Sequence, residues 1–293
     1  MKNLTKIKKY IFSSLACLIF PFNAYATFSI AAIDPLTGEV GSAGATCLNN
    51  YNLAPAISYI VPGHGVANYQ AYINPSVFPL TSNLILAGNT AKQVMQAVNI
   101  ADNQSQLRQR IIITMHDSKI EKSVFTGSTP LSYGGHASEI SGYNYVIAGN
   151  MLIGRHVLED MEMAFNSADG DLTHKLMMSV KSAVKTIGAD QRCQRFGVSS
   201  ASAYLRVAQE NDPLNQPSFS INYNSITAGV DPITRIETLY YNARPDSDND
   251  SVPDIIDAFP YDSTETADWN MDGIGNNKDL TAKDYNCGSC GTY

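Results

Sequence analysis

The order of strand-like and helix-like segments most constrains the fold of this chain. Residues 27–34 and 39–47 are mostly small or apolar, and they flank the sequence DPLTGE, whose proline and glycine mark a turn. This pattern predicts a β-hairpin at the start of the body of the protein. Further strand-like segments lie at residues 56–73 and 109–127.

Helical spacing of apolar residues begins after the opening hairpin. The helix-like segments cover residues 91–100, 154–168, 171–187 and a stretch from Asp231 to about Asn242. Strand-like segments return between the last two of these helices, at residues 196–208 and 218–223. Strands, then paired helices, then strands again bury their apolar faces best as two sheets with helices outside them. We therefore expect an α+β domain.

The first 26 residues have the three parts of a bacterial-type secretory signal. A basic start with four lysines precedes an apolar stretch at residues 11–20, and Ala24 and Ala26 are the small residues expected at positions −3 and −1. This pattern predicts cleavage before Thr27 and export, so that the protein is periplasmic or secreted. The alternative is a lipoprotein signal with Cys17 as the lipidated residue, but the apolar stretch before Cys17 is short for that.

Charge is distributed unevenly along the predicted mature chain. The 20 basic residues less the four lysines of the signal leave 16 against 27 acids, a net charge of −11. Residues 246–284 carry eleven acids and two lysines, whereas residues 27–245 carry 16 acids and 14 bases. An acidic tail on a nearly neutral body argues against nucleic-acid binding and favours a cation partner. No segment after the signal approaches the about 20 apolar residues that span a bilayer, so we expect no transmembrane segment.

The acidic tail, residues 246–293, has the residue spacing of calcium-binding loops. Oxygen-bearing side chains recur at positions 1, 3, 5, 9 and 12 of two segments, and a backbone carbonyl can serve at position 7. The predicted ligands are Asp246, Asp248, Asp250, Val252, Asp254 and Asp257 in the first loop, and Asp268, Asn270, Asp272, Ile274, Asn276 and Asp279 in the second. We expect the tail to fold when calcium binds. The alternative is an acidic tail that stays disordered.

Four cysteines remain after cleavage of the predicted signal. Cysteines tend to pair in an oxidising compartment, and Cys47 with Cys193 is the natural long-range bridge. Cys287 and Cys290 form a CxxC pair close to the end of the chain, outside any βαβ setting. A small local disulfide is therefore favoured there over a redox-active site.

Thr27 is the candidate nucleophile because cleavage would make it the first residue. An N-terminal threonine carries a hydroxyl and an α-amino group of pKa about 8, so the amine can accept the hydroxyl proton directly or through one water. The alternative is that Thr27 merely suits signal peptidase and begins a strand. Residues 197–201 lack the second glycine of a serine nucleophile elbow, which argues against a serine triad. The five histidines are scattered along the sequence, so no zinc site is predicted.

Three segments together resemble one protein family. They are TFSIAAIDPLTGEVGSAGAT at residues 27–46, AGNMLIG at 148–154 and GADQRCQRFGVSSASAYLRV at 188–207. They resemble the domain of unknown function 1028 family, which is placed in the N-terminal-nucleophile (Ntn) hydrolase superfamily. The resemblance implies a four-layer αββα sandwich over residues 27–245, with the nucleophile at the start of the first strand. The stretch DSDNDSVPDIIDAFPYDSTETADWNMDGIGNN in turn resembles thrombospondin type 3 repeats, whose loops wrap calcium.

The family resemblance also implies roles for individual residues. Thr27 would be the nucleophile and, through its amine, the general base, while Asn150 would donate a hydrogen bond to an oxyanion. Asp190 and Arg192 would pair and hold either the α-ammonium group or a carboxylate of the substrate. The alternatives are a turn-capping role for Asn150 and a structural salt bridge between Asp190 and Arg192.

Three functions follow from these patterns. The first is an exported Ntn-type enzyme that hydrolyses a small amide or peptide bond and carries a calcium-stabilised tail. The second is a non-catalytic exported binding module on the same scaffold. The third is a calcium-dependent adhesion or scaffold protein, whose tail binds a cell-surface partner or another copy of the chain. The mature N-terminus separates the first from the others, because only a chain that begins at Thr27 has the catalytic amine.

Overall fold

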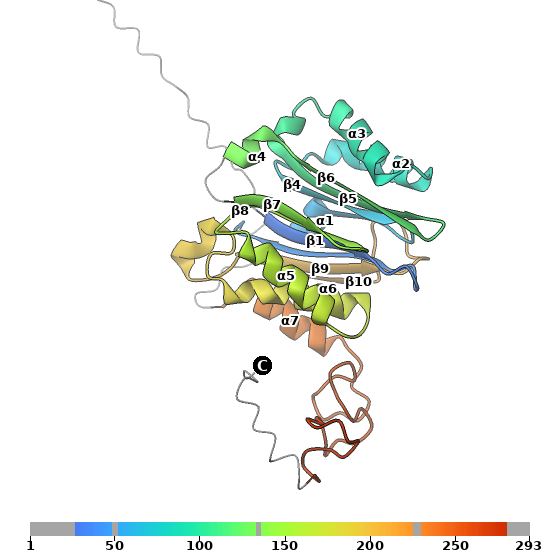
Figure 1. Ribbon diagram of the computed structural model, residues 1–293, viewed down its shortest axis with the longest axis vertical. Coiled ribbons are helices and arrows are strands. Elements are labelled where there is room, and N and C mark those ends of the chain that lie inside the picture. The colour runs from blue at the N-terminus through green and yellow to red at the C-terminus, as the bar shows by residue number, and fades with distance from the viewer. Residues whose placement is uncertain (1–26, 49–51, 133–135, 225–229, 280–293) are drawn as a thin grey trace, which may run out of the picture.

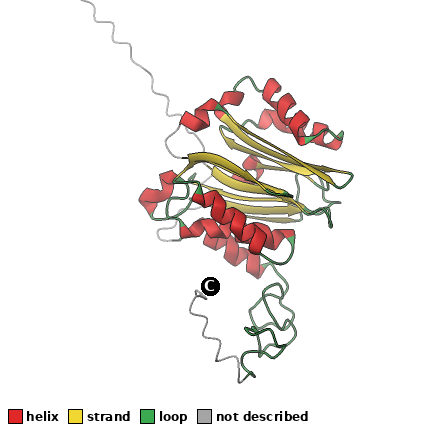
Figure 2. Ribbon diagram, in the orientation of Figure 1, coloured by secondary structure: helices red, strands yellow, loops and turns green. Residues whose placement is uncertain are grey.

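A computed structural model describes residues 27–48, 52–132, 136–224 and 230–279 (Figure 1). The predicted signal peptide and the Cys287–Cys290 pair lie outside these residues. The described residues form a mixed α+β structure with two antiparallel sheets (Figure 2). Within this part of the chain, no helix combines the length and apolarity needed to cross a membrane.

The larger sheet has six strands in the spatial order β10-β9-β2-β1-β8-β7. Their bounds are β1 (Thr27–Ile33), β2 (Val40–Thr46), β7 (His136–Ser141), β8 (Tyr145–Leu152), β9 (Ser202–Ala208) and β10 (Phe219–Tyr223). β1 and β2 form the predicted opening hairpin, whose turn contains Gly38 with a left-handed φ of 74°. β1 pairs on its other side with β8, so the first strand lies inside the sheet rather than at its edge.

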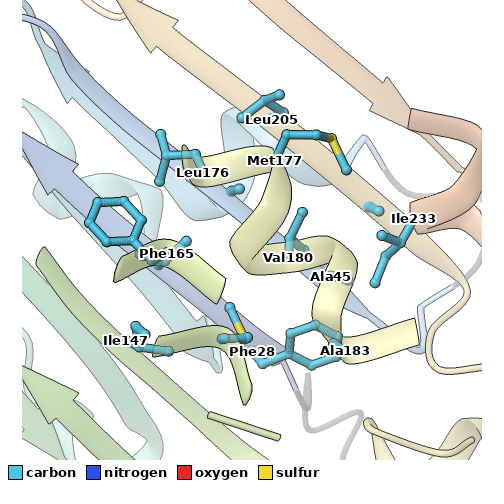
Figure 3. Packing of buried hydrophobic residues seen from close by; sticks show 14 of the residues in the cluster. Phe28, Ala45, Ile147, Phe165, Leu176, Met177, Val180, Ala183, Leu205 and Ile233 are labelled. Atoms are coloured by element: carbon cyan, nitrogen blue, oxygen red, sulfur yellow. The ribbon is translucent and has the colours of Figure 1, made fainter. Parts of the chain in front are cut away.

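Three helices cover one face of the larger sheet (Figure 1). They are α5 (His156–Ser167), α6 (Leu172–Ser182) and α7 (Pro232–Asn242). Val180 of α6 lies in one buried cluster with Phe28 of β1 and Leu205 of β9 (Figure 3). The α7 boundary agrees with the sequence signal, because Asp231 caps the helix and Pro232 occupies its first position.

The smaller sheet has four strands in the order β3-β4-β5-β6. Their bounds are β3 (Ser58–Val61), β4 (Gly65–Ala71), β5 (Arg108–His116) and β6 (Lys119–Thr126). The helices α2 (Phe78–Leu86) and α3 (Ala91–Ala101) pack on this sheet through a buried cluster of their own. Thr90 begins α3 with a capping box, in which Thr90 Oγ1 accepts from Gln93 N at 3.2 Å and Gln93 Oε1 accepts from Thr90 N at 2.9 Å.

The alternation of side chains along β1 decides which residues face the space between the two sheets. The apolar residues of β1 divide into Phe28, Ile30 and Ala32, which pack under the helices, and Ala31 and Ile33, which pack in a cluster shared with the smaller sheet. Odd-numbered positions of β1 therefore face the smaller sheet. Thr27 and Ser29 share that face, although both are polar and fully buried.

Several elements carry little local sequence signal. They are α1 (Leu53–Ile57), α4 (Ser128–Ser132), α2, β7, β8 and the 3₁₀ turns at Pro75–Val77, Ser105–Leu107, Ala183–Lys185 and Gln191–Phe196. The strand expected from residue 196 begins later than predicted. The 3₁₀ turn at Gln191–Phe196 precedes it, and β9 begins only at Ser202. Asp190 begins that turn by accepting a hydrogen bond from Arg192 N at 3.1 Å, which bends the chain before the strand.

Candidate functional site

Thr27 lies at the end of the larger sheet with a strand on each side. It is the first residue of β1 and is paired with Thr46 of β2 and with Asn150 of β8. Directly opposed residues of antiparallel strands point to the same face. The three side chains therefore face the smaller sheet together, and all three residues are fully buried in the uncleaved chain.

Asn150 connects this end of β8 to the smaller sheet. Its Nδ2 donates to Gln109 Oε1 at 2.9 Å, and Gln109 Nε2 donates to Gly149 O at 3.0 Å. Asn150 Oδ1 is buried and has no hydrogen-bond partner among the described residues. An amide NH₂ has two hydrogens, so one donor remains for a second acceptor. The predicted turn-capping alternative does not describe this residue, which lies within a strand and bonds across to the other sheet.

Asp190 and Arg192 form the predicted ion pair, and the pair lies beside Thr46. Arg192 Nη2 donates to Asp190 Oδ2 at 2.8 Å and to Thr46 Oγ1 at 3.2 Å. Asp190 Oδ2 also accepts from Cys47 N at 2.6 Å. Burial raises the pKa of Asp190, and the hydrogen bonds and charge of Arg192 oppose that rise.

The two members of this pair differ in access. The Asp190 side chain is fully buried, whereas the Arg192 side chain is 25% exposed. Both carboxylate oxygens of Asp190 already accept hydrogen bonds from Arg192 or Cys47 N, so Asp190 fixes the position of Arg192 and of the end of β2. Of the two predicted substrate-binding residues, only Arg192 has a solvent-exposed side chain. The sequence left two alternatives for this pair, a structural salt bridge and a substrate-binding group. The observed salt bridge, with its accessible arginine, is compatible with both.

The predicted disulfide joins Cys47 to Cys193 with a Cα–Cα distance of 5.5 Å. Cys47 follows directly on β2, and Cys193 lies in the 3₁₀ turn that also carries Arg192. The bridge therefore ties the turn with the ion pair to the strand next to Thr27.

A buried polar network extends from Ser29 into the space between the sheets. Ser29 Oγ accepts from Asn68 Nδ2 at 2.8 Å and from Gln70 Nε2, both on β4. Ser42 Oγ donates to Asn68 Oδ1 at 3.0 Å and also bonds Tyr204 Oη at 2.8 Å. Burial raises the pKa of Tyr204. None of these residues was predicted from the sequence, although Asn68 and Gln70 occupy alternate positions of the β4 segment GVANYQA and are a signal for them.

The tail holds two loops with the same hydrogen-bond pattern. In the first, Asp246 Oδ2 accepts from Ser251 N at 3.0 Å, and in the second Asp268 Oδ2 accepts from Gly273 N at 2.8 Å. Asp250 and Asp272 likewise accept from the residue two positions later, each at 2.8 Å. Position 4 is left-handed in both loops, with φ of 61° at Asn249 and 60° at Met271. The two loops that share a residue spacing in the sequence therefore also share a hydrogen-bond pattern and a backbone conformation.

The acidic groups of the first loop converge. Carboxylate oxygens of Asp246, Asp248 and Asp250 all lie within 4.8 Å of one another. Burial and the carboxylates of Asp250, Asp257 and Asp246 raise the pKa of Asp248. Asp257, at position 12, is only 8% exposed, and its Oδ2 has no hydrogen-bond partner in the described residues. Like charges held together in this way favour a cation between them.

The position-9 residues behave differently from the other predicted ligands. Asp254 Oδ1 accepts from Ser247 N at 2.7 Å, and Asn276 Oδ1 accepts from Trp269 N at 3.0 Å. In both loops the position-9 side chain therefore bonds the backbone of position 2. At position 12 of the second loop, Asp279 Oδ2 accepts from Asn270 Nδ2 at 3.0 Å.

Residues 27–228 match the family described as "Family of unknown function (DUF1028)". The chain belongs to this family. A solved structure of protein SPO2555 from Silicibacter pomeroyi, whose title names DUF1028, matches with a TM-score of 0.59 and 21% sequence identity. The match covers 74% of this chain and 89% of that chain. At this identity the likeness shows a shared fold alone. No curated protein matches this chain.

The DUF1028 match divides the predicted functional residues into two groups. Thr27, Asn150, Asp190 and Arg192 lie inside it, whereas α7 and both tail loops follow its last residue. The structure brings Thr27, Asn150 and, through Thr46, the ion pair together at one end of the larger sheet. The tail loops are attached beyond α7, where Arg244 pairs with Asp171 at 2.5 Å.

Proposed function

We propose that this DUF1028 protein is an exported N-terminal-nucleophile hydrolase that cleaves a small amide or peptide bond with Thr27. The observation that carries the proposal is the position of Thr27. Its side chain faces the space between two antiparallel sheets, at the end where Asn150 and the Asp190–Arg192 pair also lie. Helices pack on the larger sheet and on the smaller sheet, which supports the αββα layering of the Ntn superfamily.

The proposed chemistry depends on cleavage before Thr27, because the nitrogen of Thr27 is a non-basic peptide amide in the uncleaved chain. In the mature chain this nitrogen would be an amine that accepts the Thr27 hydroxyl proton as the oxygen attacks the substrate carbonyl carbon. The amine would then pass that proton to the leaving nitrogen as the C–N bond breaks. Attack of water on the resulting ester releases the acid and returns a proton to the threonine oxygen.

Arg192 and Asn150 would support this reaction in different ways. A guanidinium next to Thr46 favours the neutral form of a nearby amine, because a like charge lowers an amine pKa. Arg192 is also the group with which a substrate carboxylate could pair. The second hydrogen of Asn150 Nδ2 could stabilise an oxyanion. These roles make Asn150 a catalytic residue and Asp190 a positioning residue.

A non-catalytic binding module is the second candidate, and the complete burial of Thr27 favours it. Catalysis requires that removal of residues 1–26, or movement of nearby loops, opens a path to the hydroxyl. The two functions therefore predict different reactivity of the mature chain.

Intact mass and covalent labelling distinguish the two candidates. The secreted protein should have the mass of a chain that begins at Thr27. An electrophile directed at N-terminal threonine should add one label to it, and the label should be retained in Thr27→Ser and lost in Thr27→Ala. Thr37→Ala is the matched control, since Thr37 is exposed in the opening turn. A mature chain with a different first residue, or equal labelling of wild type and Thr27→Ala, rejects the hydrolase.

We further propose that the tail loops bind calcium. The convergence of Asp246, Asp248 and Asp250, together with the buried, unpartnered Oδ2 of Asp257, supports a cation in the first loop. The backbone carbonyls of Val252 and Ile274 at position 7 would complete the oxygen sets. The position-9 side chains already accept hydrogen bonds from the backbone. They would therefore coordinate calcium through a water molecule or would not coordinate it.

Calcium titration tests this proposal separately from catalysis. We expect calcium to raise the midpoint of thermal unfolding of the tail and to change its circular dichroism. Asp248→Asn should weaken binding in the first loop and Asp272→Asn in the second. Asp169→Asn removes an exposed acid outside the loops and should change neither. Equal calcium affinity in all four proteins would reject the proposed loops.

A further inference from the structure

The fold brings together two histidines that are far apart in the sequence. His64 lies in the turn between β3 and β4, and His116 is the last residue of β5. Their ring centroids are 5.8 Å apart with an angle of 62° between the ring planes. Because these two histidines are far apart along the chain, residue spacing alone does not reveal the pair. The β4–β5 pairing causes it, because Met115 N donates to His64 O at 2.7 Å and continues the ladder past Gly65.

Each imidazole has a nitrogen suited to metal binding. His64 Nδ1 lies 2.8 Å from Pro62 O. A carbonyl can only accept, so Nδ1 carries the proton in this bond and Nε2 of the neutral ring keeps its lone pair. Metal-binding histidines usually donate their other ring N–H to a carbonyl or carboxylate in this way, which fixes the ring orientation. His116 Nε2 is buried and has no hydrogen-bond partner in the part of the chain that the structure describes.

The charges around the pair are compatible with a bound cation. Lys119 is opposite His116 in the β5–β6 register, but its ammonium pairs with Glu121 at 2.5 Å. Glu210 packs against the turn before His64, since a Cβ on Gly63 would lie 2.9 Å from Glu210 Cγ. Lys119 therefore has a counter-ion, and the Glu210 side chain lies against Gly63 and Gly38.

This pair is separate from the candidate active site. Gln70, which bonds Ser29 close to Thr27, is six residues along the chain from His64, mostly within β4. At the rise of an extended strand this corresponds to about 20 Å. The histidines therefore lie at the opposite end of the sandwich from Thr27.

We propose that His64 and His116 bind a divalent transition-metal ion of the Zn²⁺ and Cu²⁺ class. Imidazole nitrogen is a preferred ligand of these ions. With a metal–nitrogen distance of about 2.1 Å, two coordinating rings stand about 5–6 Å apart between centroids, which fits the observed separation. Water, and Glu210 if its side chain turns inward, would complete the coordination. The site depends neither on catalysis at Thr27 nor on calcium in the tail.

Copper and zinc titrations of the mature protein test the site. The experiment uses a background with Cys287→Ser and Cys290→Ser, so that thiols cannot bind the metal, and saturating calcium to occupy the tail. Calorimetry with ZnCl₂ should give one site, and the electron paramagnetic resonance spectrum with CuCl₂ should show coupling to two nitrogens. His64→Asn and His116→Asn should each weaken binding by about tenfold or more. His156→Asn, an exposed histidine on α5, should leave binding unchanged.

Two outcomes would overturn the proposal. One is unchanged zinc affinity in both His64→Asn and His116→Asn, provided that their thermal unfolding midpoints match the background protein. The other is a copper spectrum with fewer than two coupled nitrogens in the background protein. Thr27→Ala is the control for metal binding at the N-terminal hydroxyl. Its zinc and copper affinities should match those of the background protein.

Discussion

Thr27 lies directly opposite Asn150 in the antiparallel pairing of β1 with β8, and both side chains face the smaller sheet. Asn150 in turn bonds Gln109 of that sheet at 2.9 Å. Strands from three distant parts of the sequence therefore meet at the residue that the predicted cleavage makes N-terminal. The candidate site depends on β8 as much as on the opening hairpin.

Asn150→Ala should slow covalent labelling of Thr27 by about 100-fold, the usual cost of removing one oxyanion donor. It should also lower the free energy of unfolding by about 1–3 kcal/mol, because Gln109 Oε1 loses its donor in a buried site. Labelling rates and urea unfolding measure the two effects. Gln109→Leu is the control, since it should destabilise the protein similarly while changing labelling only a few-fold. Equal loss of labelling in both variants would mean that Asn150 acts only as a structural residue.

Asp102 should make stability depend on acidic pH. Burial alone would raise its pKa, but hydrogen bonds from Arg108 and from Gln104 N, with the charges of Arg108 and Arg110, lower the pKa to about 2. A carboxyl whose pKa is lower in the folded state than in the unfolded chain stabilises the protein above the unfolded value. That stability, about 2 kcal/mol, is lost as pH falls from about 4 toward 2.

Asp102→Asn tests this dependence by urea unfolding at a series of pH values. At pH 7 the variant should lose about 3–5 kcal/mol, because Arg110 is fully buried and loses its counter-ion. Its stability should also fall less steeply than that of the wild type between about pH 4 and pH 2. Asp117→Asn, at an exposed turn with a positive φ of 49°, should behave as the wild type. Parallel pH profiles for wild type and Asp102→Asn would contradict the assignment.

Loss of the Cys47–Cys193 bridge should destabilise the body of the protein. The bridge spans 146 positions of sequence, and closing a loop of that length stabilises a folded chain by about 5 kcal/mol in the chain-entropy model. A Cys47→Ser, Cys193→Ser double variant should show a correspondingly lower urea midpoint. Adding reductant should shift the wild type toward the variant and leave the variant unchanged. If reductant lowers the urea midpoint of both proteins equally, the change does not come from the Cys47–Cys193 bridge.

Gly44→Ala should damage the pairing of β1 with β2. A Cβ on Gly44 would lie 2.7 Å from Phe28 O and 2.7 Å from Ser29 Cβ, so the strands would have to separate. We expect a loss of about 1–3 kcal/mol in urea unfolding, as for other overpacked sites. Gly88→Ala is the comparison, because nothing lies within 4 Å of its Cβ position and only its φ of 80° opposes the change. It should cost about 1 kcal/mol, and a larger loss for Gly88→Ala than for Gly44→Ala would contradict the steric argument.

Local signals predicted the elements that they can specify. The turn of DPLTGE, the Thr90 capping box and the Asp231–Pro232 helix start all act within a few residues, and each element is found where its signal lies. The strand expected from residue 196 was wrong in its start: the 3₁₀ turn runs to Phe196, Gly197 is left-handed with a φ of 70°, and β9 begins only at Ser202. The network around Ser29 and the pair of Arg110 with Asp102 were missed, since each depends on contacts between separate strands and loops.

The sequence by itself determined how side chains alternate along the strands and where helices begin. It also determined that the acidic loops repeat and that the chain belongs with DUF1028 proteins. These properties follow from short-range geometry and composition, which the order of residues carries directly. Only the tertiary structure decided that Asn150 and Arg192 lie near Thr27 and that His64 lies beside His116. Strand order and register set those distances, and both result from packing the whole core rather than from any single segment.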